Sequence, residues 1–171
     1  GNRSVNLPYG FVGRRQYDKV ILGQEKTEDN TLKISEEKEL CIPGTEWLNP
    51  TQQLRLQIME YTDDSKDFPR NQCTKWFDYD KIEKPLVLRT RRKGDYFTIL
   101  GKDGQMVHKS LKEYMIAEKI PQKERDGLLL LAEGSHVVWL IGYRISEYYK
   151  INRNTKHILQ VQLIGTGCGG N

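Results

Sequence analysis

The chain has 171 residues, of which 37% are hydrophobic and 29% charged, and its net charge is +4. That length can bury one core or two small ones, and the composition excludes a disordered chain. No apolar run approaches the roughly 18 residues of a membrane-spanning helix, and no secretory signal is visible. We therefore expect a soluble, cytoplasmic protein that does not bind membranes.

The first third of the chain has the pattern of short strands separated by turns. It is clearest in "QLRLQIMEY", where Leu54, Leu56 and Ile58 alternate with polar residues and point to one side of a strand. The polar stretch 62–72 contains a proline, lacks periodicity and is interpreted as a linker. The sequence thus predicts a strand-rich connecting domain over residues 1–68, incomplete at its N-terminal side, and a second domain over residues 73–164.

The second domain begins with strands and continues into a helix. The segments "PLVLRTRR" and "YFTIL" are predicted strands joined by a turn at residues 93–95, and "GKDGQ" has the chemistry of a tight turn. Ser110 and Glu113 form a capping-box pattern at the start of a helix that Pro121 should end. The helix places three apolar residues on one face: Leu111, Tyr114 and Met115.

Two further strands complete the pattern. "HVVWLIGYRI" is almost continuously apolar, which is typical of a buried strand, and "HILQVQLI" alternates with Leu159, Val161 and Leu163 inward. The sequence predicts an α+β, strand-rich fold with β-sandwich-like layers and one or two helices. The final "GTGCGGN", residues 165–171, resembles a dinucleotide-binding glycine motif, but no helix follows it, so we expect a flexible tail.

Catalytic and metal-binding motifs are not evident. The chain has no phosphate-binding loop, nucleophile elbow or zinc helix. Cys41, Cys73 and Cys168 are far apart and show no metal-ligand spacing, which predicts three reduced thiols and no metal site. The three histidines are equally scattered and give no reason to expect ligands.

The positive charge is concentrated in the middle of the chain. Residues 84–125 contain 11 Lys and Arg against 5 Asp and Glu, whereas residues 1–83 contain 12 against 15. In an extended segment Arg89, Arg91 and Lys93 would share one face, with Arg92 near the turn. Arginine binds phosphate through two hydrogen bonds at once. Tyr96, Phe97 and Tyr114 are candidates for stacking on a base. For Phe97 and Tyr114, packing in the core is the competing interpretation. The residues alone therefore indicate a nucleic-acid or phosphate-binding module without catalytic groups.

Several segments together resemble a known family. "KWFDYDKI", "LRTRRKGDYF", "LKEYMIAEKIPQKERD", "LLLLAEGSHVVWLIGYRISEYYKI" and "TKHILQVQL" occur in the order found in the C-terminal region of bacterial tRNA(Ile)-lysidine synthetases of the Gram-positive type. The resemblance runs from Trp76 to Leu163, and "VNLPYGFVGRRQYDKVIL" extends it upstream. It rests on the combination of R-x-R-x-x-G-D, K-I-P-x-x-x-R-D and V-W-x-x-G-x-R-I-S.

The resemblance implies a function for the parent enzyme. Such enzymes use ATP to adenylate the wobble cytidine of the isoleucine tRNA with a CAU anticodon, and lysine then displaces AMP to give lysidine. ATP, Mg and lysine act in an N-terminal ATP-pyrophosphatase domain, whose Ser-Gly-Gly-x-Asp-Ser loop is not found here. The resemblance implies an inactive, cofactor-free, tRNA-recognition portion that contacts the acceptor stem, with a fold similar to a domain of the phenylalanyl-tRNA synthetase β chain.

The expected tRNA contacts come from the resemblance and from the charge pattern. The resemblance assigns Arg89, Arg91, Lys119 and Arg125, and the charge pattern adds Arg92, Lys93, Lys109 and Lys112, although the family has a more continuous lysine run before the helix than "QMVHKSLKE" offers. The expected structural positions of the motifs are Gly94, Asp95, Pro121, Asp126, Gly142 and Arg144. Asp95, Asp126 and Arg144 could equally form internal ion pairs. Two alternatives stay open: a basic protein-interaction or homodimerisation module without RNA binding, and an enzyme for an anionic small molecule, which would need a polar pocket.

Overall fold

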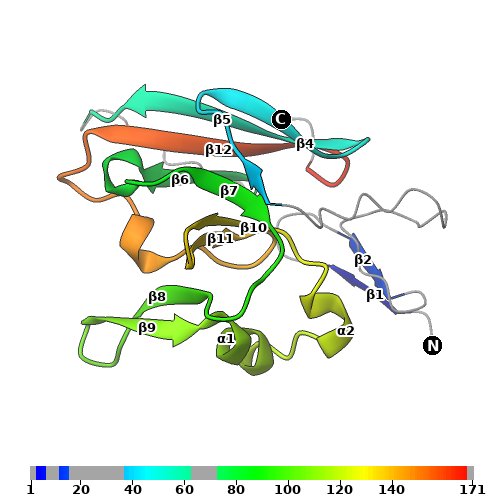
Figure 1. Cartoon of the computed structure of the whole chain (residues 1–171). Coiled ribbons are helices and arrows are strands. Elements are labelled where there is room, and N and C mark those ends of the chain that lie inside the picture. Colours follow the sequence, from blue (N-terminus) through cyan, green and yellow to red (C-terminus); the bar gives the residue numbers. More distant parts are fainter. Residues whose placement is uncertain (1–2, 7–11, 16–36, 63–72, 169–171) are drawn as a thin grey trace.

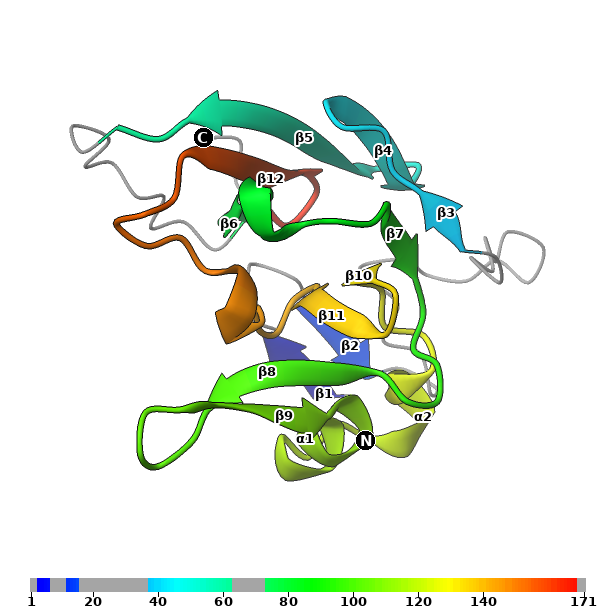
Figure 2. The ribbon, with the colours of Figure 1, turned by 60° about the vertical axis from the view of Figure 1, so that its left-hand side comes forward.

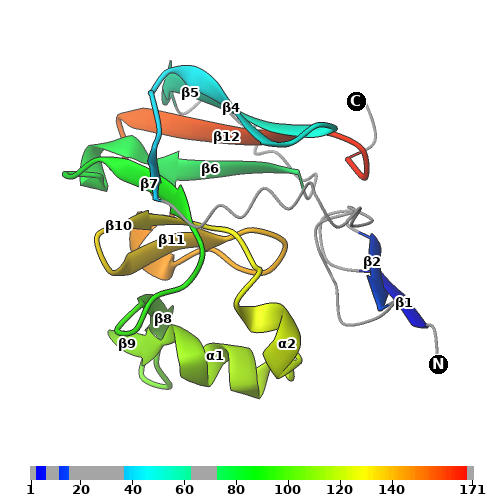
Figure 3. The same cartoon turned by 45° about the vertical axis from the view of Figure 1, so that its right-hand side comes forward.

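The computed structural model describes residues 3–6, 12–15, 37–62 and 73–168. Figure 3 shows three layers: a four-stranded sheet, a six-stranded sheet, and two short helices on the far side of the second sheet. Strands β1 (Arg3–Asn6) and β2 (Val12–Arg15) pair only with each other among the described strands, and are antiparallel. The strand-rich α+β prediction is confirmed. No helix in the described part of the chain is both long and apolar enough to cross a membrane.

The four-stranded sheet has the order β4-β5-β12-β6 and is antiparallel throughout (Figure 1). Its strands are β4 (Gly44–Asn49), β5 (Gln52–Glu60), β12 (His157–Gly165) and β6 (Thr74–Asp78). The alternation predicted for β5 and β12 is confirmed, because Leu54 and Leu56 lie opposite Leu163 and Val161 in the core. Ile58 lies on the same face as predicted, opposite Leu159, but near the end of β5 it is 39% exposed.

The six-stranded sheet has the order β3-β7-β10-β11-β8-β9. Its strands are β3 (Lys38–Glu39), β7 (Leu86–Arg89), β10 (Leu130–Glu133), β11 (His136–Leu140), β8 (Tyr96–Leu100) and β9 (Met106–Ser110). Strands β7, β10 and β11 of this sheet are buried on both faces, which explains their nearly continuous apolar runs. Leu88 and Leu131 pack toward the four-stranded sheet, while Val87 and Leu130 pack toward the helices.

The helical layer consists of α1 (Leu111–Ala117) and α2 (Gln122–Arg125). The Ser110 hydroxyl accepts the Glu113 N–H, and the three predicted apolar residues of α1 are buried, so both predictions are confirmed. Pro121 does not end the helix. The chain has already left α1 at Ala117 and reverses at Lys119, whose φ is +56°, and Pro121 instead precedes α2.

The predicted domain boundary between residues 68 and 73 is wrong. Strand β3 pairs with β7, and β5 pairs with β12, so strands from both sides of the boundary share both sheets (Figure 2). Long-range strand pairing, which the local sequence pattern does not report, makes residues 37–62 part of the same folded unit. Residues 63–72 of the predicted linker, and most of residues 1–36, lie outside the described part of the chain.

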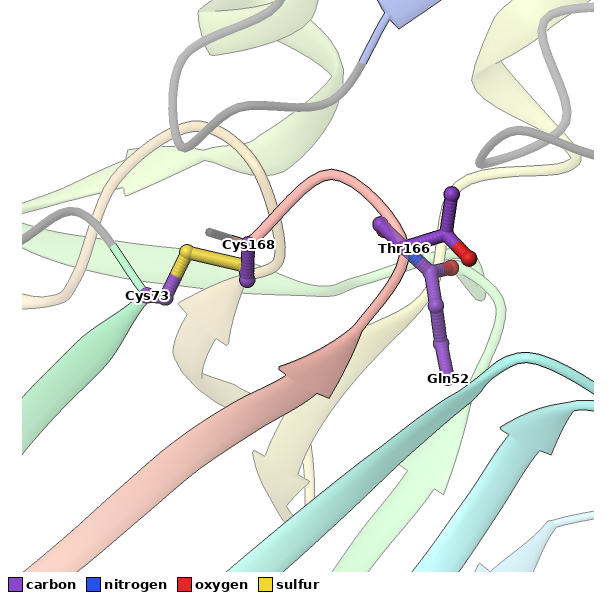
Figure 4. The surroundings of a disulfide bond; sticks show 4 residues. All are labelled: Gln52, Cys73, Thr166 and Cys168. Atoms are coloured by element: carbon purple, nitrogen blue, oxygen red, sulfur yellow. A yellow bond between two sulfur atoms is a disulfide. The ribbon is translucent and has the colours of Figure 1, made fainter. Parts of the chain in front are cut away.

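A disulfide bond joins Cys73 to Cys168 (Figure 4), so the prediction of three reduced thiols is wrong. The cysteines meet because β12 runs beside β6, and the Leu163 N–H donates to the Cys73 carbonyl at 2.7 Å. Cys41 is free and exposed.

The same corner of the fold fixes residues 165–168, which were expected to be flexible. The Gln52 side-chain amide donates to the Thr166 carbonyl at 2.7 Å, and a β-bridge joins Gly165 to Cys168. The expectation is therefore wrong for residues 165–168, while residues 169–171 lie outside the described part.

The described part of the chain also contains two short 3-10 helices, η2 (Tyr79–Lys81) and η3 (Glu147–Tyr149). The second one packs beside β8, where the hydroxyl of Ser146 accepts the Thr98 N–H at 2.9 Å. This contact holds the segment after β11 against the β8–β9 hairpin.

Candidate nucleic-acid interface

Arg89 lies at the end of β7 and points into the interior, not toward a partner. Its side chain is 4% exposed, and its two terminal nitrogens each donate to the Asp95 carboxylate at 2.8 Å. The same nitrogens donate to the backbone carbonyls of Thr90 and Gly134. The expectation that Arg89 shares an exposed face with Arg91 is therefore wrong, because its side chain is buried and both terminal nitrogens donate within the fold.

This buried pair shapes the loop between β7 and β8, which we call the basic loop, residues 90–94. The Asp95 carboxylate also accepts the backbone N–H of Arg92 at 2.7 Å, and the Asp95 N–H donates to the Arg92 carbonyl. Gly94 has a φ of +92°, a conformation that glycine adopts without a steric penalty. The R-x-R-x-x-G-D motif thus contains its own brace: the first arginine and the aspartate hold the turn, and the glycine permits it.

The basic loop presents two exposed cations. Arg92 is 55% exposed and contacts Glu37 at 2.6 Å, and Lys93 is exposed, with no ion pair to any described residue. Arg91 is more restricted, because it donates to Asp126 from both Nε and Nη2 at 2.8 Å and is 23% exposed. Since Asp126 is 78% exposed, this pair gains little from burial and can exchange for another anion.

The remaining predicted contacts are spread over β9 and the helical layer. Lys112 on α1 and Lys119 after it are exposed, and Lys109 on β9 is half-buried. Arg125 donates from Nε to the Ile120 carbonyl at 2.8 Å, a contact that closes the turn between the helices. The structure therefore connects the basic loop to α2 through Arg91, but it gives Arg125 an internal role.

The residues expected to be structural fulfil internal roles. Gly142 is buried with a φ of +89°, and it lies in the turn after β11. The Arg144 guanidinium lies 3.6 Å from Glu147 and 5.9 Å from the Tyr114 ring centroid. With Arg89–Asp95 and Arg91–Asp126, all three groups that could have formed internal ion pairs do so.

Phe97 and Tyr114 are core residues, as the competing interpretation held. Their rings pack edge to face between the six-stranded sheet and α1, with 5.1 Å between the ring centroids. Nearby, burial raises the pKa of Tyr143 to about 12, and Glu124 and Glu118 add to this. Tyr96, on the opposite side of β8 from Phe97, is only partly buried.

Sequence reasoning missed the histidines. His108 and His136 both stack on Tyr96, although the three are far apart in sequence. Burial lowers the pKa of His136 to about 4, with repulsion from His108 adding to the effect and Glu133 opposing it. The hairpin turn would have placed His108 near Tyr96, but His136 arrives through the parallel pairing of β11 with β8.

Comparison with known proteins decides the family. The model of the TilS substrate C-terminal domain matches residues 86–163, which include the basic loop and both helices. Residues 86–163 belong to the TilS C-terminal domain family. A crystal structure described as the TilS C-terminal domain shares 27% sequence identity and a TM-score of 0.58, covering 76% of this chain and 96% of that one.

Longer relatives match nearly all of the chain. A tRNA(Ile)-lysidine synthase of Caldanaerobacter subterraneus subsp. tengcongensis is 34% identical over 158 residues, which is 92% of this chain and 32% of the relative. One of Clostridium acetobutylicum is 36% identical over 170 residues, or 94% of this chain and 34% of the relative. This chain thus spans about a third of the length of these curated relatives.

Proposed function

We propose that this chain is the tRNA-holding C-terminal portion of a tRNA(Ile)-lysidine synthase and that it does not perform the chemistry. The observation that carries the proposal is the basic loop, which presents Arg92 and Lys93 from a turn braced by a buried ion pair. A braced loop loses little conformational entropy when it meets a phosphate backbone. The names of the relatives, which specify tRNA(Ile), support the same substrate class.

In this proposal the partner is the isoleucine tRNA with a CAU anticodon, gripped on its acceptor-stem side in the cytoplasm. ATP, Mg and lysine belong to a separate catalytic domain. The groups of the basic loop suit holding better than catalysis, because Arg92 and Lys93 are exposed and Arg91 is paired with the Asp126 carboxylate. In the described residues no three His, Cys, Asp or Glu side chains gather in a way that could hold a metal ion.

The experiment is tRNA binding across a salt series. Each phosphate contact that a cation makes contributes about 0.9 to the slope of log affinity against log salt on a duplex. We expect the Arg92→Ala/Lys93→Ala variant to bind more weakly, with a slope shallower by about one to two units.

One further double variant serves as the control. Arg153→Ala/Lys156→Ala removes the same charge from the segment between η3 and β12, on the opposite side of Figure 2 from the basic loop. Its slope should match that of the unmodified chain. Equal slopes for all three proteins, or no tRNA binding at all, would refute the proposed function.

A further inference from the structure

A group of aromatic rings lies on the face of the β8–β9 hairpin that points away from α1. We call it the aromatic face: Tyr96 on β8, His108 on β9, His136 on β11 and Tyr148 on η3. Phe97 packs against α1 on the other side, so the alternation of β8 places Tyr96 on the opposite face. The hairpin, β11 and η3 therefore meet in one surface.

The rings form a continuous contact. The centroid of Tyr96 lies 4.4 Å from that of His108 and 4.7 Å from that of His136, with interplanar angles of 26° and 22°. The Tyr148 ring follows at 5.3 Å from His136. His108 is exposed and Tyr148 is 37% exposed, so ring surface is open to solvent at both ends of the group.

The centre of the aromatic face is rigid. Nε2 of His136 lies 2.8 Å from the Thr98 hydroxyl and 3.0 Å from the Ser146 hydroxyl. The lowered pKa of His136 keeps this ring neutral at physiological pH, so it offers a ring face and not a charge. A ligand that stacks here meets a preformed surface and avoids the entropic cost of ordering it.

The edge of the face is apolar on one side and basic on another. Leu100 and Met106 pair across the hairpin on the same face as Tyr96, and each is 53% exposed. Lys81 lies 5.4 Å from the Tyr148 ring centroid. The face is also continuous with the basic loop, because Tyr96 directly follows Asp95, whose carbonyl accepts the Leu111 N–H.

A nucleotide needs both of these surfaces: a ring on which its base can stack and cations near its phosphate. We propose that the aromatic face stacks an unpaired nucleotide of the tRNA whose duplex the basic loop holds. This inference rests on the proposed function and adds a second contact of a different chemistry. Because stacking is sequence-tolerant, the face would recognise that a nucleotide is unpaired and not which base it carries.

The test compares two RNA probes on the whole chain: fluorescein-labelled single-stranded oligouridylate, and a blunt RNA duplex. His108→Leu/Tyr148→Leu removes the exposed rings but keeps apolar bulk, and Val107→Ala is the control. Val107 is 43% exposed on the same hairpin, but it pairs with Ile99 on the opposite face. We expect the double variant to bind oligouridylate about tenfold more weakly and the duplex unchanged, while the control changes neither.

Thermal melting of each variant separates a folding defect from a lost contact. If the melting temperature of the double variant is lower than that of the unmodified chain, His108→Leu is tested alone. His108 is exposed on the edge strand β9, so its replacement should disturb the fold least. The stacking role of the aromatic face is refuted if the double variant binds oligouridylate as tightly as the unmodified chain, or if the unmodified chain does not bind it. Duplex binding by the same proteins would still support the proposed function. Loss of self-association in the variant, with RNA binding intact, would also refute it and assign the surface to a second copy of the chain.

Discussion

Arg89 and Asp95 face each other in the interior of the TilS C-terminal domain, with two parallel N–H···O bonds of 2.8 Å between them. The first arginine of the R-x-R-x-x-G-D motif therefore acts on the shape of the basic loop. The arginines and the lysine that reach solvent depend on this pair for their position. Arg89, which belongs to the motif, and Arg92, which lies between motif positions, thus serve different purposes, and variants can separate them.

Asp95→Asn should lower the free energy of unfolding by about 3–5 kcal/mol, because it leaves the Arg89 charge buried without a counter-charge. The matched control is Asp126→Asn, which breaks the exposed pair with Arg91 and should cost less than about 1 kcal/mol. Urea denaturation followed by tryptophan fluorescence measures both. Equal losses in the two variants would show that burial does not distinguish these pairs.

Acid should destabilise the domain through His136. The pKa of this group is lowered from 6.5 to about 4 in the folded state, so the unfolded chain takes up the proton first as the pH falls. Stability from this residue is therefore fully present above about pH 6.5 and is lost as the pH falls through about 4. His136→Gln should flatten the dependence of the urea midpoint on pH over this window. A variant with the same pH dependence as the unmodified chain would contradict the assignment.

Reduction should weaken the fold at the corner that the disulfide closes. Cys73 and Cys168 are separated by 95 residues, and a cross-link of that span typically contributes about 2–4 kcal/mol. We expect dithiothreitol to lower the urea midpoint of the unmodified chain and to leave Cys73→Ala/Cys168→Ala unaffected. Cys41→Ala is the control, since this thiol is free, and it should respond to reductant as the unmodified chain does.

Gly165→Ala should be more damaging than Gly104→Ala, although both glycines have positive φ. A Cβ at Gly165 would lie 1.9 Å from the Thr51 carbonyl oxygen, whereas one at Gly104 meets nothing within 4 Å. The second change costs only backbone strain, about 1–2 kcal/mol. The first must also displace β12 from the turn after β4. Thermal melting of the two variants compares them directly, and similar melting temperatures would contradict the close approach.

Local patterns predicted the local structure well. The alternation in β12, the Ser110 cap of α1 and the turn between β8 and β9 each depend on residues only a few positions apart. The fold class followed from these elements. The long-range strand pairings could not be predicted in this way, because the sequence of a strand indicates which face is apolar but not which strand lies beside it.

The candidate interface shows the same limit. Strand alternation grouped Arg89 with Arg91, but only the three-dimensional structure reveals that this side of β7 is covered by the helical layer and by Asp95. The disulfide and the aromatic face depend on β12–β6 and β11–β8 neighbours, respectively. No signal in the separate segments reports either contact.

The attachment of the β8–β9 hairpin has a consequence for motion. Its backbone joins the rest of the six-stranded sheet through a single registered pair, Tyr96 with His136, and through the Tyr96 N–H to the Ser135 carbonyl. The Ser146 hydroxyl, which accepts the Thr98 N–H, and the packing of Phe97 against α1 provide the other contacts. Amide hydrogens of β8 and β9 should exchange with deuterium well before those of β5 and β12. The aromatic face is preformed in the closed state, from which the hairpin opens only in rare local excursions while the two-sheet sandwich stays closed.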